Sequence, residues 1–309
     1  MMAAVKLDIF THLSKGTMDA EEVADSLSVN ASRLRPLLYA LVAYDLLKVK
    51  DGRFSNTPEA DHFLSSTSPD YMGHTLELWE SLWGVTDFTV DSIRTGEPKA
   101  KHDYSKLPKE ELENVLGLLH HGTVMVARQL LIQYDFSDYR TLIDVGGGTG
   151  GLAITIAEQC PNIQATVLEL PNVAYLTQNF IDKSGISDRL KVVAADVVHD
   201  SLSGSYDVAV LKALIQVLSP DEGQIVLRNV YNILEPGGRI FIVGRILDDS
   251  HTAPLIDVAF SLVMLNVYEK GQAFTEGEYR DWLMNAGFKD IQRSILPNAF
   301  QIITALKTK

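Results

Sequence analysis

The sequence predicts an α/β protein in which a doubly wound, Rossmann-like parallel sheet follows a smaller, helical winged-helix module. Three observations support this prediction. Strand-like and helix-like segments alternate from about residue 140 onwards, a glycine-rich turn joins the first of these strands to its helix, and two helical patterns followed by a hairpin lie near the start of the chain. We expect two domains, at residues 1–105 and 106–309.

The N-terminal segment has the pattern of a winged helix. Ala20–Leu27 and Ala31–Leu47 carry apolar residues at three- and four-residue spacing, which is typical of amphipathic helices, and Asn30 is a candidate cap of the second helix. Residues 47–55, with the turn Asp51-Gly52 at their centre, predict a two-stranded wing. A winged helix can bind DNA, but a formal net charge of −13 favours a packing or dimerisation module, because nucleic acid attracts clustered Lys and Arg.

The composition also bears on compartment and partners. Hydrophobic residues make up 46% of the chain and charged residues 22%, as in ordinary soluble domains. Cys160 is the only cysteine, so an internal disulfide is excluded and a cysteine-based metal site is not expected. We find neither an uninterrupted apolar run of membrane-spanning length nor a signal-peptide pattern. We therefore expect a cytoplasmic protein with no membrane, nucleic-acid or metal partner.

The C-terminal segment has the alternation of a doubly wound sheet, after a mainly helical stretch at residues 70–135. The expected strands span residues 141–145, 164–169, 191–195, 206–212, 238–246, 290–294 and 300–306. The expected helices span residues 150–159, 172–184, 220–234 and 276–286. Ligands of such sheets bind at the carboxyl ends of the strands, where the glycine-rich turn is expected to lie.

The glycine-rich turn predicts a nucleoside cofactor. It runs from Asp144 to Gly151, and its glycines, among them Gly146 and Gly148, allow a tight turn and a close approach of the backbone to a ligand. Glu169 ends the next expected strand, where an acid can accept hydrogen bonds from ribose hydroxyls.

Neighbouring residues select among cofactors, since NAD, FAD and S-adenosylmethionine sites all use such glycines. Asp144 can pair with a cationic ligand, and Asp196 follows the next strand, where an acid can accept from an adenine amino group. Two late strands are joined by a helix, and Pro236-Gly237-Gly238 opens the second of them. This combination favours S-adenosylmethionine.

The whole chain resembles the small-molecule O-methyltransferases of plants and their bacterial and animal relatives, which are class I methyltransferases. The residues that carry the resemblance are Glu22-Val23-Ala24, Asp144–Gly151, Glu169-Leu170-Pro171, Asp196, Pro236-Gly237-Gly238, Phe274–Tyr279 and Ala286-Gly287-Phe288. The resemblance implies S-adenosylmethionine as cofactor, S-adenosylhomocysteine as product, a small, aromatic or conjugated methyl acceptor, and a homodimer.

The resemblance also implies which residues bind the cofactor. They are Asp144, Gly146, Gly148, Glu169, Leu170, Asp196, Val197, Lys212 and Thr123. In this mapping Glu169 binds the ribose hydroxyls, Asp196 with Val197 binds the adenine, and Lys212 reaches the cofactor from the end of its strand. Thr123 lies where family members often carry a hydroxyl near the amino-acid end of the cofactor.

The sequence departs from the family's pattern at the general base. The plant enzymes carry a histidine four residues after the Lys212 position, held by two glutamates, whereas this chain has Gln216, Gly244 and Ala273. The amide of a glutamine does not titrate, so Gln216 cannot remove a proton. Methyl transfer would then depend on alignment of donor and acceptor, or on a base from elsewhere.

Other residues are candidates for this chemistry. His120, His121, His74 and Asp257 could supply a base, although the adjacent histidines point about 100° apart on a helix and are poor joint metal ligands. Arg245 could hold an anionic group of the acceptor bidentately, or could form a surface or salt-bridged contact instead.

Further features of the sequence fit more than one interpretation. Asp248-Asp249 resembles a paired-carboxylate metal site, but without a third ligand nearby a solvated loop or an arginine partner is favoured. Trp79 and Trp83 fit either a core or an aromatic pocket. Because the histidine and both glutamates are absent, two alternatives to methyl transfer stay open. One is a non-methyl reaction (cyclisation, decarboxylation or hydroxylation), and the other is cofactor binding without catalysis.

Overall fold

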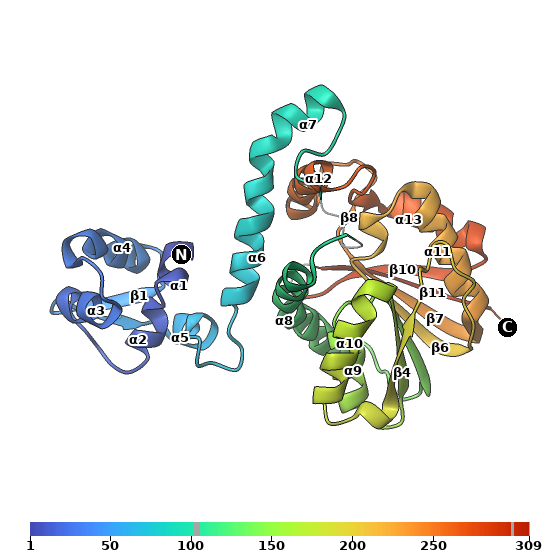
Figure 1. The fold of residues 1–309 in the computed structure, drawn as a ribbon, viewed down its shortest axis with the longest axis horizontal. Helices are drawn as coiled ribbons and strands as arrows, with labels where there is room; N and C mark the ends of the chain where they lie inside the picture. The colour runs from blue at the N-terminus through green and yellow to red at the C-terminus, as the bar shows by residue number, and fades with distance from the viewer. Residues whose placement is uncertain (102–105, 298–299, 309) are drawn as a thin grey trace. The chain divides into compact units, whose positions relative to one another are not determined.

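The chain forms two compact units, Met1–Ser81 and Leu82–Lys309 (Figure 1). The computed structural model describes residues 1–101, 106–297 and 300–308, so residues 102–105, at the expected domain boundary, lie outside it. The units divide earlier in the chain than residue 105, because α7 (Thr89–Thr95) packs against α12 (Leu255–Val267) of the second unit.

The first unit consists of short helices and a hairpin, as the sequence predicts. Its helices are α1 (Met2–Lys6), α2 (Ile9–Leu13), α3 (Ala20–Leu27), α4 (Ala31–Ala43) and α5 (Pro58–Leu64), and its hairpin pairs β1 (Leu47–Lys50) with β2 (Arg53–Asn56). The side chain of Asn30 caps α4 by accepting the N–H of Arg33, which satisfies an otherwise unpaired donor. Helix α4 ends at Ala43, before the expected Leu47, since Leu47 already pairs with Asn56 in the hairpin.

The second unit contains a seven-stranded sheet within the described residues, in the order β10-β11-β7-β6-β3-β4-β5. Its strands are β3 (Thr141–Val145), β4 (Gln164–Glu169), β5 (Leu190–Ala194), β6 (Tyr206–Lys212), β7 (Leu234–Gly244), β10 (Lys289–Ile295) and β11 (Gln301–Leu306). Strands β3 to β7 are parallel, while β11 is antiparallel to both β7 and β10. The doubly wound fold is confirmed, with a mixed rather than wholly parallel sheet.

Helices cover both faces of this sheet (Figure 1). The helices of the second unit outside α7 and α12 are α8 (Lys109–Gln133), α9 (Gly151–Gln159), α10 (Pro171–Lys183), α11 (Pro220–Ile233) and α13 (Glu276–Ala286), with short 3₁₀ turns η1 (Val85–Phe88), η2 (Ser187–Arg189) and η3 (Ile215–Val217). One apolar core joins α8, α9 and α10 to the sheet, and another joins α11 and α13 to the opposite face. The order in which strands are added to the sheet reverses between β3 and β6, which is where such sheets bind ligands.

Two elements differ from the sequence-based expectation, and a third bears on an interpretation that the sequence left open. Helix α12 was not predicted, because its sequence is apolar over most of its length and shows no clear helical period. The expected strand 238–246 is interrupted at Arg245, and β8 (Ile246–Leu247) pairs instead with β9 (Phe274–Thr275). Helix α6 (Gly73–Gly84) crosses the boundary between the units and carries Trp83, which is 39% exposed, so the core interpretation does not fit it.

Helix α8 is long and rich in apolar residues. Among the described helices it alone is long and apolar enough to cross a membrane, with 25 residues and a mean hydropathy of 1.3. Its residues Val126, Ala127 and Leu130 pack in the core with α9 and the sheet. Only part of α8 is covered in this way, since 28% of its apolar window is buried and Ile132 near its end is 82% exposed.

Candidate cofactor and acceptor site

The glycine-rich turn joins β3 to α9 in a conformation that only glycine adopts easily. Gly146, Gly148 and Gly150 have φ angles of 67°, 59° and 75°, in the left-handed region. A Cβ atom at Gly147 would lie 2.7 Å from the carboxyl group of Asp144. The turn is therefore dictated locally by its glycines, and it lies at the carboxyl end of β3 as predicted.

Glu169 holds this turn from the end of β4. Its Oε2 accepts the N–H of Gly148 at 2.6 Å, and its Oε1 accepts the N–H of Leu170 at 2.7 Å. Burial raises the pKa of this carboxyl, while the two backbone N–H groups act in the opposite direction. Each oxygen keeps a further lone pair, so the carboxylate can still accept from a hydroxyl group.

Asp144 is a buried carboxyl whose charge is only partly compensated. Its side chain accepts the N–H of Ala153 through Oδ2 at 3.3 Å, whereas the buried Oδ1 has no hydrogen-bond partner in the described part of the chain. Burial raises the pKa of Asp144 to about 7, and the neighbouring Glu169 adds to this rise, while Ala153 and Lys212 oppose it. A cationic ligand would offset the cost of this buried charge, so the site fits a cofactor with sulfonium and ammonium groups.

Lys212 and Thr123 meet at the end of β6, although they are far apart in the sequence. Nζ of Lys212 donates to Oγ1 of Thr123 at 3.1 Å, and Thr123 in turn donates to the carbonyl of Leu119 on α8. Burial lowers the pKa of Lys212 to about 8; Asp144 opposes this shift and Arg245 adds to it.

Asp196 lies two residues after the end of β5, as Glu169 lies at the end of the neighbouring strand β4. Its Oδ1 accepts the N–H of Val198 at 2.9 Å, and its Oδ2 lies 2.9 Å from Nδ1 of His199. Burial raises the pKa of Asp196, but the hydrogen bonds from His199 and Val198 outweigh this and lower it overall. The adjacent Val197 is buried. Sequence reasoning missed His199, whose position three residues after Asp196 was the available signal.

Gln216, in the turn η3, is brought together with Gly244 at the end of β7. The side chain of Gln216 is 5% exposed, and its Oε1 accepts the N–H of Arg245 at 3.1 Å. A Cβ atom at Gly271 would lie 2.7 Å from the carbonyl oxygen of Gln216, so the segment leading to the buried Ala273 also runs beside this residue. The side-chain amide is held by a backbone donor and has no titratable proton.

Arg245 forms a buried ion pair with Asp257 of α12. Nη1 of Arg245 lies 3.2 Å from Oδ1 of Asp257, and the two side chains are 5% and 0% exposed. The guanidinium carbon lies 4.3 Å from the ring centroid of Phe300. Burial lowers the pKa of Arg245 and raises that of Asp257, and each partner opposes the other's shift. Of the two interpretations given for Arg245, the structure shows the salt-bridged contact. The same ion pair occupies Asp257, which was one of the candidate bases.

The three candidate histidines lie in different surroundings. His120 packs against the glycine-rich turn, with Nδ1 2.7 Å from Oγ1 of Thr149. Burial lowers its pKa to about 4, and His121 adds to this decrease. His121 itself is exposed. His74 lies in the first unit, with its Nδ1 3.9 Å from Oε2 of Glu77.

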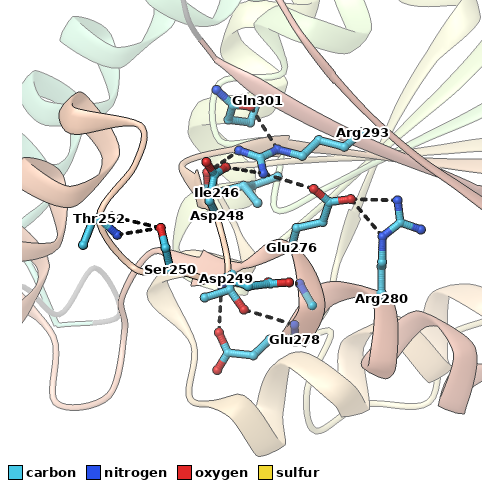
Figure 2. A network of polar contacts seen from close by, with 12 residues as sticks. Ile246, Asp248, Asp249, Ser250, Thr252, Glu276, Glu278, Arg280, Arg293 and Gln301 are labelled. Carbon is cyan, nitrogen blue, oxygen red and sulfur yellow. Dashed lines mark hydrogen bonds and ion pairs between the residues drawn. The ribbon is translucent and has the colours of Figure 1, made fainter.

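The Asp248-Asp249 pair has protein partners (Figure 2). Oδ1 of Asp248 lies 2.7 Å from Nη1 of Arg293, and Oδ1 of Asp249 accepts the N–H of Gly277 at 2.8 Å. The arginine partner that the sequence favoured for this pair is therefore Arg293. No group of three His, Cys, Asp or Glu side chains within the described ranges could hold a metal ion.

The fold and the acid-lined strand ends define a class I methyltransferase domain, and comparison with known proteins specifies the family. Residues 91–289 match the profile of the O-methyltransferase domain, and residues 1–66 match that of the O-methyltransferase dimerisation domain. The chain belongs to this O-methyltransferase family. It is an S-adenosylmethionine-dependent methyltransferase, and S-adenosylmethionine is its cofactor.

Individual relatives align over nearly the whole chain. The 3-hydroxy-5-methyl-1-naphthoate 3-O-methyltransferase of Streptomyces sahachiroi is 30% identical, over 99% of this chain and 91% of its own length. The N,N-dimethyltransferase OxyT of Streptomyces rimosus is 27% identical, over 96% of this chain and 88% of its own. The structure of human N-acetylserotonin methyltransferase with S-adenosylmethionine is similar with a TM-score of 0.82 at 25% identity, covering 100% of this chain and 93% of that one.

Proposed function

We propose that this methyltransferase acts on a small aromatic or conjugated metabolite and that a hydroxyl oxygen is its methyl acceptor. The observation that carries the proposal is the full-length similarity to a hydroxynaphthoate O-methyltransferase, because it includes the helices outside the cofactor-binding strands as well as the strands themselves. The similarity to an N,N-dimethyltransferase leaves nitrogen, and with it carbon, as the second choice of acceptor atom.

In this proposal the cofactor-binding residues act at the ends of four neighbouring strands. Glu169 and Leu170 bind the ribose, Asp196 and Val197 bind the adenine, and Lys212 and Thr123 bind the amino-acid end, beside Gly146 and Gly148 of the turn. The bound cofactor supplies an electrophilic methyl group on a sulfonium. The buried Asp144 supports the arrangement, since an ionised carboxyl in this position complements a cationic ligand.

We further propose that the reaction proceeds without a histidine base. Gln216 stands at the position of that base, and Gly244 and Ala273 stand at the positions of the two glutamates. The hydrogen bond from the N–H of Arg245 to Oε1 supports this role, because it orients the amide as a fixed polar group. Alignment of the two reactants then supplies the rate enhancement, and an acceptor of low pKa releases its proton to water.

An acceptor panel tests the proposal. The purified protein is incubated with S-adenosylmethionine and, separately, a hydroxynaphthoate, a simple phenol and an aromatic amine, and products are followed by mass spectrometry. We expect a product heavier by one methylene group together with S-adenosylhomocysteine, with the hydroxynaphthoate as the preferred acceptor. An acceptor altered without methyl gain would support cyclisation, decarboxylation or hydroxylation instead. Cofactor binding without any conversion across the panel would support the non-catalytic alternative.

We also propose a cytoplasmic homodimer. The match of residues 1–66 to a dimerisation domain supports the homodimer, and the single cysteine favours a reducing compartment. Light scattering coupled to size-exclusion chromatography should give twice the mass of the chain at micromolar concentration. A monomer at all concentrations would contradict the dimer.

A further inference from the structure

The imidazole ring of His120 rests directly on the cofactor-binding turn. Its Nδ1 lies 2.7 Å from Oγ1 of Thr149, whose side chain is buried. A Cβ atom at Gly151 would lie 3.0 Å from the same nitrogen, so the ring packs closely against the backbone of the turn. A side chain at position 151 would require the ring to move by a few tenths of an ångström.

Helix α10 completes the enclosure of the turn. The ring of Phe180 is stacked on that of His120, with centroids 4.4 Å apart and planes inclined by 30°. One turn earlier on α10, Oγ1 of Thr177 donates to the carbonyl of Gly148 at 2.5 Å. Helices α8 and α10 therefore hold adjacent residues of the turn and meet each other through the two rings.

Helix α8 is attached to the cofactor site at a second point. Thr123 follows His120 by three residues, which places both side chains on one face of the helix. The hydrogen bond from Lys212 to Thr123 joins that face to the end of β6, while the bond between His120 and Thr149 joins it to the turn after β3. The helix thus connects the ends of β3 and β6, the two neighbouring strands between which the strand order reverses.

The surroundings of His120 do not suit a base. Burial and the nearby His121 keep its pKa near 4, so the ring is a weak proton acceptor at neutral pH. Its Nδ1 is also engaged with Thr149. An uncharged ring held between a hydroxyl and an aromatic side chain is suited to fixing the position of its neighbours.

We propose that His120 is a positioning residue for S-adenosylmethionine binding: its neutral imidazole fixes Thr149, and with it the shape of the turn that receives the cofactor. This role rests on the cofactor-binding function of the turn and is independent of which acceptor is methylated. The role depends on the hydrogen bond between His120 and Thr149, and the stacking of His120 on Phe180 supports it.

Two substitutions at position 120 separate the two contacts. His120→Phe keeps a ring for Phe180 and removes the nitrogen, whereas His120→Asn keeps a polar group in the place of Nδ1 and removes the ring. Calorimetric titration with S-adenosylhomocysteine measures cofactor-site affinity without an acceptor. We expect His120→Phe to weaken binding about tenfold and His120→Asn to stay within about threefold of the unchanged protein. His62→Phe, at a histidine of the first unit whose side chain is 52% exposed, is the matched control and should bind as the unchanged protein does.

A double-mutant cycle tests the partner. Thr149→Val should weaken binding as His120→Phe does, and the double variant should bind no more weakly than either single variant, because both remove one interaction. Effects that multiply in the double variant, unchanged affinity of His120→Phe, or loss of affinity in His120→Asn alone would each overturn the proposal. Failure of the unchanged protein to bind S-adenosylhomocysteine would overturn the cofactor site itself, whereas binding without methyl transfer to any acceptor would overturn only the proposed reaction.

Discussion

A Cβ atom on Gly244 would lie 2.8 Å from Oε1 of Gln216, so the amide of Gln216 occupies the space that a side chain at position 244 would need. The same oxygen accepts the N–H of Arg245, which holds the amide in place. The two positions are therefore coupled through volume as well as through hydrogen bonding. A residue larger than glycine at position 244 requires a different side chain, or a different side-chain position, at 216.

This coupling predicts the effect of Gly244→Ala on stability. The new methyl group forces the amide of Gln216 away from Arg245, and we expect a loss of about 1–3 kcal/mol in the free energy of unfolding. In a Gln216→Ser background the space is free, and most of that loss should disappear. Chemical denaturation of the four proteins of the cycle measures both values. Gly122→Ala on α8, where a Cβ atom meets nothing within 4 Å, is the control and should not destabilise the protein. An equal loss in both backgrounds would contradict the coupling.

The raised pKa of Asp144 predicts that cofactor affinity depends on pH. The carboxyl is protonated below about pH 7 and becomes negative above it. Its negative charge favours the cationic cofactor, so affinity for S-adenosylmethionine should increase as the pH rises through about 7. Calorimetry on either side of that pH measures the change. Asp144→Asn should remove this dependence and bind more weakly at the higher pH. A flat profile in the unchanged protein would argue against an ionising Asp144 in the site.

Glu169 should be needed for the shape of the turn and for ribose binding. Glu169→Gln replaces one carboxylate oxygen by an N–H₂ group, which faces the backbone N–H of either Gly148 or Leu170 and cannot accept from it. We expect affinity for S-adenosylhomocysteine to fall at least about tenfold. Glu158→Gln, the same change at an exposed position on α9, should leave the affinity unaltered. Equal affinities of the two variants would reject the assigned role of Glu169.

The charged network around Arg293 should stabilise the fold rather than the reaction (Figure 2). Its guanidinium bonds to Asp248, Glu276, Gln301 and the carbonyl of Ile246, and thereby ties β10 to β11, to the loop after β8 and to α13.

Removing this guanidinium should lower the free energy of unfolding. The side chain of Arg293 is only 13% exposed, so Arg293→Met leaves partly buried acceptors unpaired and should cost about 2–3 kcal/mol. Arg280→Met removes a more exposed arginine, 41% accessible, from the same Glu276 and should cost clearly less. Urea denaturation compares the two variants. A larger loss in Arg280→Met would contradict the central place of Arg293.

Much of the fold was predictable because its signals are local. The strand before the turn is a short apolar run, the glycines of the turn have positive φ angles, and Gly287 ends α13 in the left-handed conformation. Helix α12 could not be predicted in this way, since a helix that is apolar over most of its length loses the periodic signal that reveals one buried face.

The site was predictable only in part. The positions of Glu169 and Asp196 follow from strand order, because acids at the ends of neighbouring parallel strands must lie at the same edge of the sheet. The partner of Asp196, His199, and the pairing of Arg245 with Asp257 were not predictable, since a residue's type does not tell which charged neighbour reaches it.

The sequence by itself determined the class of fold, the glycine-rich turn after β3 and the acids beside it, because these depend on interactions within a strand, a turn or a helix. Only the tertiary structure decided the joining of His120 to Thr149 and of Thr123 to Lys212, which are separated by 29 and 89 residues. Both contacts depend on which face of α8 is turned towards the sheet. A helix that is apolar on several sides leaves that facing undetermined until it packs against the sheet and α9.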